Sequence, residues 1–364
     1  MFSLLLSKYL NKNILAVFIV FFLILSLILV GNQFFLVFSQ SIKDGLFGFE
    51  IFPLILLKFI RDIPFILILS FSLSLIYSLN KLYKNSELTI ISTAGVGEIE
   101  IIRMIKVLII PITTIILVIT FSIIPIVKSE IFLYKENAKL RPDYVFLKSG
   151  SFQNLRNNST FFSQESKSDE NGGQILKNIF IHSRENNKVI ISKSGQKILD
   201  SHNAIFLELY NGKIYENLNL QENSPLSTSS FEILKLNIFE PNKNSYFISN
   251  NNSEHKSIKS LLFSWNNEDI IEFLYRVSIP IMFLIISFIS VFLSKVNPRT
   301  GKNFSLGYGL ILFLAYYNIL IYVKKISVSY FENSIVIFSI SHLLFFVILL
   351  ALYLVKQNII FRKN

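Results

Sequence analysis

Long apolar runs separated by polar stretches dominate the hydrophobic pattern of this chain. Runs free of Asp, Glu, Lys and Arg occupy residues 14–30, 63–79, 107–127, 277–293, 304–323 and 334–355. Each approaches or reaches the roughly 20 residues that a helix needs to cross the hydrocarbon core of a bilayer. We therefore predict a helical membrane protein with six transmembrane helices, three on each side of a central polar stretch.

The central stretch, residues 128–268, has a different pattern and no run long enough to cross a bilayer. Short alternating segments recur there at residues 160–162, 179–182, 188–192, 204–209 and 231–236. Alternation with a period of two is typical of half-buried strands, and the Asn-Gly pair at 211–212 is the strongest hairpin signal. The pattern predicts an inserted all-β sandwich or jelly roll at 128–268, between helical domains at 1–127 and 269–364.

A charged interruption, residues 80–106, separates the second and third predicted spans. Its centre, residues 86–96, is predicted to form a short helix. Ser86 is expected to cap its first turn, where the charge of Glu87 is favourable. Gly95 is expected to end it, because glycine adopts left-handed backbone angles at little cost. Such a helix offers a surface that a cytosolic partner could grip, and an ordinary amphipathic loop helix is the alternative.

Composition and charge support a membrane protein. Hydrophobic residues make up 52% of the chain and charged residues 16%, against about 25% charged residues in ordinary soluble domains. A net charge of +11 would suggest nucleic-acid binding in a soluble protein, but basic cytoplasmic loops account for much of it here, so we expect no nucleic-acid partner. Twelve Lys and Arg residues lie in the ends and loops of one side, while Lys43, Lys324 and Lys325 lie on the other. The positive-inside rule therefore predicts cytoplasmic termini and an external β domain.

The sequence contains no convincing catalytic set. There is no cysteine, no Walker A pattern, and none of the four histidines has a partner at metal-ligand spacing. We therefore expect no catalytic residues, no metal and no nucleotide hydrolysis by the chain itself. His342 lies inside the last predicted span, where an interhelical hydrogen bond is favoured over a functional role. Lys43, Lys324 and Lys325 are candidates to attract an anionic substrate at the outer mouth, with interfacial snorkelling as the alternative.

The sequence contains three distinctive short segments: KLYKNSELT at 81–89 with AGV at 94–96, LKSGSF at 147–152, and VNPRTGK at 296–302. Together they resemble one known family, the LptF/LptG permeases of the lipopolysaccharide exporter. Residues 81–89, KLYKNSELT, followed by AGV at 94–96, are similar to the coupling segment of that family. Residues 147–152, LKSGSF, resemble the start of its periplasmic β-jellyroll. Residues 296–302, VNPRTGK, contain Asn297, Pro298, Arg299 and Gly301 of a cytoplasmic loop motif that resembles the LptF branch more than LptG. Val96-Gly97 departs from the usual Ile/Leu-Ser.

The resemblance implies an inner-membrane permease that pairs with a second six-span permease and recruits a cytosolic ATPase dimer, which binds the ATP. Ser86, Glu87, Leu88 and Gly95 fall in the coupling segment, and Glu87 matches the glutamate expected to meet a basic residue of the ATPase. Lipopolysaccharide would enter laterally between the two permeases, and the β domain would join a periplasmic bridge towards the outer membrane.

Two further functions remain open from the sequence. One is a membrane-anchored structural subunit that passes force to an external domain without moving lipid. The other is a membrane enzyme, which the lack of a catalytic set disfavours. Co-purification with lipopolysaccharide, and ATPase activity that depends on residues 80–106, would distinguish the permease from both.

Overall fold

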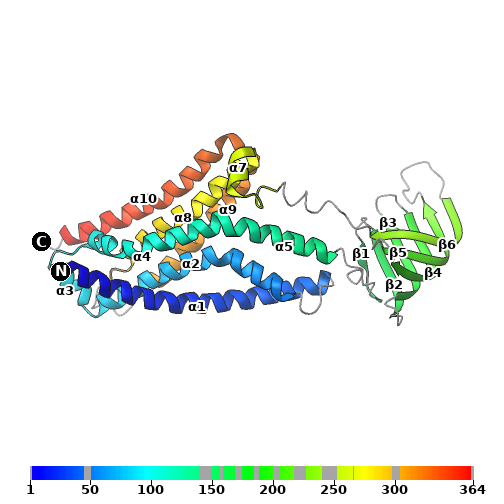
Figure 1. The fold of residues 1–364 in the computed structure, drawn as a ribbon, viewed down its shortest axis with the longest axis horizontal. Coiled ribbons are helices and arrows are strands. Elements are labelled where there is room, and N and C mark those ends of the chain that lie inside the picture. Colours follow the sequence, from blue (N-terminus) through cyan, green and yellow to red (C-terminus); the bar gives the residue numbers. More distant parts are fainter. Residues whose placement is uncertain are drawn as a thin grey trace. The chain divides into compact units, whose positions relative to one another are not determined.

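The computed structural model describes most of the chain. The described residues are 2–44, 51–139, 149–155, 159–168, 174–183, 188–199, 205–216, 227–239, 252–264, 266–296 and 304–361. They form two compact units, one helical and one built from strands (Figure 1). The expectation of a helical membrane protein with an inserted β domain is confirmed.

The helical unit contains the helices in which the six apolar runs lie. In chain order the elements are α1 (Phe2–Asp44), α2 (Ile51–Lys84), α3 (Glu87–Thr93), α4 (Glu98–Val118), the π turn η2 (Ile119–Ile123), α5 (Ile124–Lys139), α7 (Ile258–Ser264), α8 (Asn267–Leu293), α9 (Ser305–Ser329), the 3₁₀ turn η4 (Phe331–Asn333) and α10 (Ser334–Phe361). Among the described residues, five segments are long and apolar enough to cross a membrane: Leu5–Ser39, Glu98–Lys135, Asn267–Leu293, Ser305–Ser329 and Phe331–Val355.

The remaining predicted span is the helix α2, which is not among those five. Most of its residues between Ile66 and Tyr83 are buried inside the bundle. Its apolar side chains therefore contribute to the core of the helical unit, whereas much of the apolar surface of α1 and α10 is exposed.

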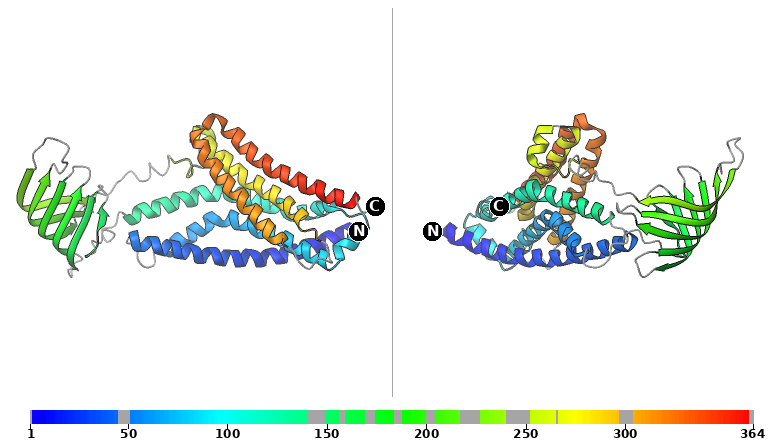
Figure 2. Two further views of the ribbon diagram at one scale, coloured as in Figure 1. Left: turned by 180° about the vertical axis from the view of Figure 1, so that it is seen from behind. Right: turned by 45° about the vertical axis from the view of Figure 1, so that its right-hand side comes forward.

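The bundle is organised around α8, which packs against α2, α4, α9 and α10 (Figure 2). Phe283 of α8 contacts Phe71 of α2, with ring centroids 5.3 Å apart. By contrast, Leu27 of α1 is 75% exposed and Leu343 of α10 is 62% exposed. Exposed apolar helix faces of this kind are suited to lipid or to another membrane subunit.

The third predicted span is one long helical segment interrupted by a π turn. Helix α4 passes into η2 at Ile119, and α5 follows from Ile124. Pro125, the second residue of α5, lacks a backbone N–H and so cannot donate the helical hydrogen bond to the preceding turn. The π turn therefore accommodates a proline within an otherwise continuous helix.

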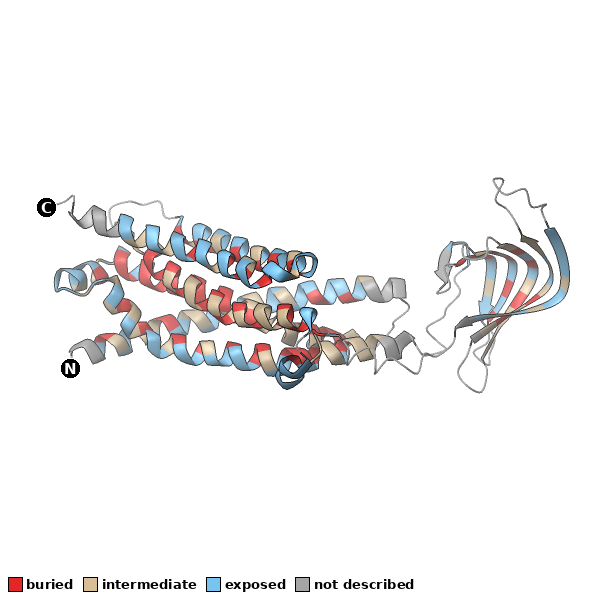
Figure 3. Ribbon diagram, turned by 90° about the horizontal axis from the view of Figure 1, so that it is seen from above, coloured by how far each residue is buried: buried red, intermediate tan, exposed pale blue. Residues whose placement is uncertain are grey.

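The β unit is a single antiparallel sheet in which each strand pairs with the next. Its strands are β1 (Gln153–Leu155), β2 (Ser159–Ser168), β3 (Gln174–Ser183), β4 (Lys188–Leu199), β5 (Ile205–Glu216) and β6 (Ser227–Phe239). All five predicted strand segments fall in this sheet, except that Ala204, the first residue of one of them, lies outside the described residues. The predicted sandwich or jelly roll would contain two facing sheets. The described residues form one curved sheet instead, which wraps around its own buried side chains (Figure 3).

The predicted hairpin at Asn211-Gly212 is wrong, since both residues lie inside strand β5. Asn211 has a φ of 54°, and Asn178 in β3 has a φ of 49°. Neither asparagine appears among the residue pairs that align the neighbouring strands. Within β3 the buried side chains are Leu176 and then Ile179, so the alternation of inward and outward positions shifts by one residue there. The left-handed preference of asparagine that favours hairpin turns is used here for irregularities that bend the sheet.

Gly212 is required by the packing of the same bend. A Cβ atom added there would lie 2.5 Å from the carbonyl oxygen of Ile191 and 2.3 Å from the ring of Phe231. The sheet beside it is hollowed by a cavity of about 640 Å³, lined by aromatic and aliphatic side chains together with Lys193 and Lys213. The bend therefore creates a largely apolar hollow on one face of the β unit.

Candidate functional site

The coupling segment folds as the short helix α3, which covers Glu87–Thr93 rather than the expected 86–96. Ser86 occupies the N-cap position with a φ of 63°, and its side chain makes no capping hydrogen bond. The prediction of a side-chain cap at Ser86 is therefore wrong. The backbone turns sharply there instead, with the N–H of Ser86 donating to the carbonyl of Tyr83 at 3.0 Å.

The predicted end of the helix at Gly95 is confirmed. Gly95 has a φ of 92°, and its N–H donates to the carbonyl of Ser92 at 3.1 Å. The N–H of Val96 donates to the carbonyl of Ile91 at 3.4 Å. These two bonds form a Schellman motif, in which left-handed glycine satisfies the last carbonyls of a helix.

One face of α3 is anchored to the bundle and the other is exposed. Leu88 is buried in the main core, and Ile91 packs against the same core. Ile90 is 68% exposed, and Thr89 is exposed beside it. A seven-residue helix with one anchored face presents the opposite face to solvent, where another protein can contact it.

Glu87 is already hydrogen-bonded within the chain. Its carboxylate accepts the hydroxyl proton of Tyr9 in α1 at 2.8 Å and the amide of Asn85 at 3.3 Å. These bonds hold the first turn of α3 against the start of α1. Both contacts are solvent-exposed, so a stronger cationic partner can compete for the same carboxylate.

A second ion pair fixes the turn that follows α3. Lys295, just beyond α8, pairs with Glu98 in the first turn of α4. The segment after α3 is thereby tied to the loop that begins at the end of α8. Asn297, Pro298, Arg299 and Gly301, the predicted motif of that loop, lie outside the described residues.

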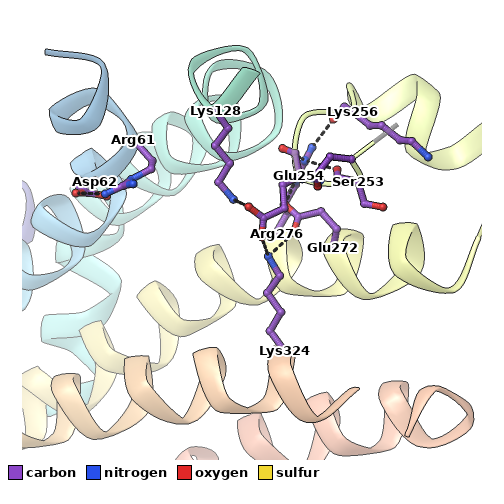
Figure 4. Close-up of polar contacts among 10 residues, drawn as sticks. Arg61, Asp62, Lys128, Ser253, Glu254, Lys256, Glu272, Arg276 and Lys324 are labelled. Carbon is purple, nitrogen blue, oxygen red and sulfur yellow. Dashed lines mark hydrogen bonds and ion pairs between the residues drawn. The ribbon is translucent and has the colours of Figure 1, made fainter. Parts of the chain in front are cut away.

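A larger polar cluster, of which sequence reasoning singled out only Lys324, lies at the other end of the bundle from α3 (Figure 1), and Figure 4 shows its contacts. It is built around residues 252–264, which we call the strap. Arg276 of α8 is 1% exposed and donates from its Nη atoms to the backbone carbonyls of Ser253, Glu254 and Lys256, at 3.0 to 3.3 Å. Its Nε donates to Glu272 at 2.9 Å. One buried guanidinium thus fastens the strap to α8.

A second contact fastens the same segment to α8. The Nζ atom of Lys256 lies 2.7 Å from a carboxylate oxygen of Asp269, which is fully buried. The hydroxyl of Ser264 donates to the same carboxylate at 2.5 Å. A buried carboxylate must be paired and hydrogen-bonded to be tolerated, and both conditions are met here.

Glu254 extends the cluster to two further helices (Figure 4). Its carboxylate lies 3.0 Å from the Nζ of Lys128 in α5 and 2.5 Å from the Nζ of Lys324 in α9. Burial alone would raise the pKa of Glu254, but the two lysines lower it to about 2. Lys324 also pairs with Glu272 at 2.7 Å. The strap is therefore linked to α5, α8 and α9.

The predicted outer-mouth cations differ in their surroundings. Lys324 lies within α9 rather than in a loop, and it is engaged by two carboxylates. Lys325, the next residue, is exposed. Lys43 lies in α1 near its end. The structure does not bring all three together as one described site.

Arg61 and Asp62, neighbours in α2, form an ion pair. Arg61 donates to both oxygens of Asp62 at 2.7 and 3.0 Å, and Gln33 of α1 donates to the same carboxylate at 2.8 Å. They line a cavity of about 250 Å³ that also contacts Lys128, Glu272 and aliphatic side chains. This cavity has charged and apolar walls within the helical unit.

His342 makes the expected interhelical hydrogen bonds. Its Nε2 lies 2.9 Å from the hydroxyl of Ser278 in α8, and its Nδ1 lies 2.5 Å from the hydroxyl of Tyr316 in α9. Ser278 gives its one proton to a backbone carbonyl and so must accept from Nε2–H. The Nδ1 atom then accepts from Tyr316. The histidine joins α8, α9 and α10 in its neutral form, which supports a structural role.

Within the described residues, no group of three or more His, Asp or Glu side chains could hold a metal ion. The geometry supplies instead an exposed short helix at one end of the bundle and a buried ionic cluster at the other. This arrangement is suited to transmitting movement or binding charged ligands.

Comparison with known proteins gives a family for the whole chain. No individual curated protein matches the sequence. The model of the family described as lipopolysaccharide export system permease LptF/LptG matches residues 8–355. That model covers both branches, so the expected LptF identity stays a prediction. Because the match spans nearly the whole chain, including α3, the strap and the β unit, the chain belongs to the LptF/LptG family of lipopolysaccharide export permeases.

Proposed function

We propose that this chain is one permease subunit of an ABC transporter that extracts lipopolysaccharide from the inner membrane. A second six-span permease completes the membrane channel, and a cytosolic ATPase dimer supplies the energy. Membership of a lipopolysaccharide export family implies an export complex with partner subunits at the inner membrane. The single observation that carries the finer proposal is α3, a short helix with an anchored face and an exposed face.

Movement of the ATPase reaches the bundle through the contacts of α3. Leu88 is buried in the main core, and Glu98 is paired with Lys295 at the end of α8. A force on α3 therefore acts on the core and on the central helix together. Glu87 is the residue that we assign to a basic partner on the ATPase, in exchange for its present bond to Tyr9.

The remaining surfaces fit a lipid with an anionic head and apolar chains. Lys43, Lys324 and Lys325 are proposed to attract the head group at the outer mouth. The exposed apolar face of α1 suits lateral lipid entry beside a second permease. The hollow of the β unit, with Lys193 and Lys213 at its wall, is proposed to receive acyl chains after extraction. We place α3 and both termini on the cytoplasmic side of the membrane and the β unit on the periplasmic side.

The test is ATP-driven release of lipopolysaccharide from proteoliposomes that contain this chain with its partner permease and ATPase. Wild type should release lipid on addition of ATP, while Glu87→Lys should abolish release without removing the chain from the membrane. ATP hydrolysis with no lipid release by the wild-type complex would favour the alternative, a force-transmitting subunit that does not move lipid.

A further inference from the structure

Helix α7, the last part of the strap, has one face anchored to the bundle and another left uncovered. Leu261 is buried, and the hydroxyl of Ser264 donates to a buried carboxylate of α8. Leu262 is exposed, and Phe263 is 90% exposed. Together with the exposed Ile258, three of the seven residues of α7 are large apolar side chains that the other described residues leave largely uncovered.

The exposed apolar side chains follow the turn of the helix. Ile258 and Leu262 are four residues apart, so they lie on the same stripe of α7. Phe263 extends that face, and Lys259 lies within it, with a stem long enough to carry its ammonium group to water. Ser260 is exposed about 160° around the helix from Leu262. The exposed surface of α7 thus divides into an apolar side and a polar side.

The start of α8 places α7 at the level of the membrane surface. Helix α8 has 27 residues, which span about 40 Å at 1.5 Å per residue, close to the thickness of a bilayer with its head groups. Since α8 is long and apolar enough to cross the membrane, its first residue, Asn267, falls in or near the head-group layer. Helix α7 ends at Ser264, three residues earlier in the chain. Its uncovered side chains are therefore within reach of the lipid interface.

The neighbouring helix ends have the same character. Ile271 of α8, Val323 of α9 and Phe338 of α10 pack together, so the start of α8, the end of α9 and the start of α10 lie at one end of the bundle (Figure 1). At this end Tyr330, between α9 and α10, is exposed, and so is Ile335 of α10. Aromatic side chains are enriched where membrane helices meet the head groups. The uncovered side of α7 thus lies at the same level as helix surfaces that are suited to lipid.

We propose that α7 is an interfacial helix whose apolar side, with Leu262 and Phe263, inserts into the surface of the lipid bilayer. Amphipathic helices of this kind bury their apolar side chains at the boundary between head groups and acyl chains. The lipid surface then holds the strap in addition to Arg276, so the chain that returns from the β unit is anchored twice before α8 begins. This inference goes beyond the proposed function, because it concerns contact with bulk lipid and requires neither transport nor a partner subunit.

The test places an environment-sensitive nitrobenzoxadiazole fluorophore at Leu262→Cys or at Ser260→Cys in the full-length chain, which has no cysteine of its own. Each variant is reconstituted in phosphatidylcholine vesicles, with and without a lipid that carries a nitroxide near the head-group end of its acyl chain. The fluorophore at 262 should emit at a shorter wavelength than in water and be quenched by the nitroxide. The fluorophore at 260, the matched control on the polar side of the same helix, should emit as in water and be quenched much less.

These readouts separate the possible surroundings of the apolar side. Emission at a shorter wavelength from 262 without nitroxide quenching would mean that protein covers this side, and water-like emission from both positions would mean that it faces water. Equally strong quenching at 262 and 260 would place α7 inside the bilayer instead of at its surface. Each of these three results would overturn the inference.

Trp265, the only tryptophan in the sequence, follows α7 directly and gives a label-free readout. Its fluorescence should be quenched in vesicles of brominated phosphatidylcholine. Phe263→Asp should lose most of this quenching, because a carboxylate resists transfer out of water, and the exposure of Phe263 allows the change without loss of the fold. Ser260→Asp adds the same charge on the polar side and should keep the quenching. Equal quenching in the two variants would overturn the insertion of Phe263.

Failure of this inference differs from failure of the proposed function. Both measurements use the chain alone in lipid, so a negative result with intact ATP-driven lipid release would overturn the interfacial helix and leave the permease function standing. Absence of lipid release from the wild-type complex would overturn the permease function, whatever the fluorescence shows.

Discussion

The two ends of the helical bundle hold their polar groups in opposite ways. At the strap, Arg276 and Asp269 are buried, and their contacts with the strap join it to α8. At α3, the bond between Glu87 and Tyr9 is exposed, and the helix is shaped mainly by backbone bonds around Gly95. Buried ion pairs fix a geometry, whereas exposed polar contacts exchange partners readily. The comparison indicates a rigid junction at the strap and a replaceable contact at α3.

The largest effect is expected from Arg276→Met. This change removes the bonds to three strap carbonyls and leaves the buried Glu272 without its guanidinium partner, at a cost of about 3–5 kcal/mol. Arg103→Met is the control, since Arg103 makes an exposed pair with Glu100 that is worth less than about 1 kcal/mol. Thermal unfolding in detergent measures both. Similar losses in the two variants would remove the distinction between buried and exposed ends.

Glu87→Lys should weaken capture of the partner ATPase by at least about tenfold, because it reverses the charge assigned to a basic partner. Its own unfolding temperature should change little, since the contacts of Glu87 are exposed. Glu100→Lys makes the same charge reversal in α4, close in sequence, and should leave capture intact. A pull-down from membranes measures this, and equal capture by wild type and Glu87→Lys would contradict the role of Glu87.

Gly95→Ala should loosen the end of α3 by about 1 kcal/mol, because alanine resists the left-handed angles found there. Gly97→Ala is the matched control: neither site has an atom within 4 Å of the added Cβ, and Gly97 has a negative φ. Amide hydrogen exchange across residues 87–96 reports the difference. Equal protection in both variants would show that the Schellman motif does not hold α3 in place.

The smallest effect near neutral pH concerns Glu254. Its pKa is lowered from 4.5 to about 2 in the folded protein, so its ion pairs contribute stability above about pH 4.5. That contribution is lost as the pH falls from 4.5 towards 2. The stability difference between wild type and Glu254→Gln should therefore be constant from pH 5 to 8 and shrink in acid. A difference that already shrinks between pH 7 and 6 would assign the contacts to another group.

The ends of α3 differ in how far sequence predicts them. Gly95 was predictable because glycine adopts left-handed angles at less cost than any other residue type. Ser86 was not, because a serine that precedes a helix serves either as a side-chain cap or, as here, as a left-handed turn. The Asn211-Gly212 pair carried a correct backbone preference, but only the neighbouring strands decide whether it makes a turn or a bend.

The strap cluster was beyond the sequence for a different reason. Glu254 lies 126 residues from Lys128 and 70 from Lys324, and no local pattern links charges at such separations. Glu272 and Arg276 did give a signal, since residues four apart on a helix face each other. That pair would have extended the predicted helix from residue 277 back to residue 272, whereas α8 begins at Asn267.

The central claim is that α3 faces the cytosol, where a partner ATPase drives the bundle. Since the chain has no cysteine, single cysteines at Ile90 of α3 and Ile233 of β6, which are 68% and 63% exposed, can be labelled selectively. A membrane-impermeant maleimide applied to spheroplasts should label the cysteine at 233 at once and the one at 90 only after permeabilisation. Labelling of the cysteine at 90 in intact spheroplasts would contradict the account.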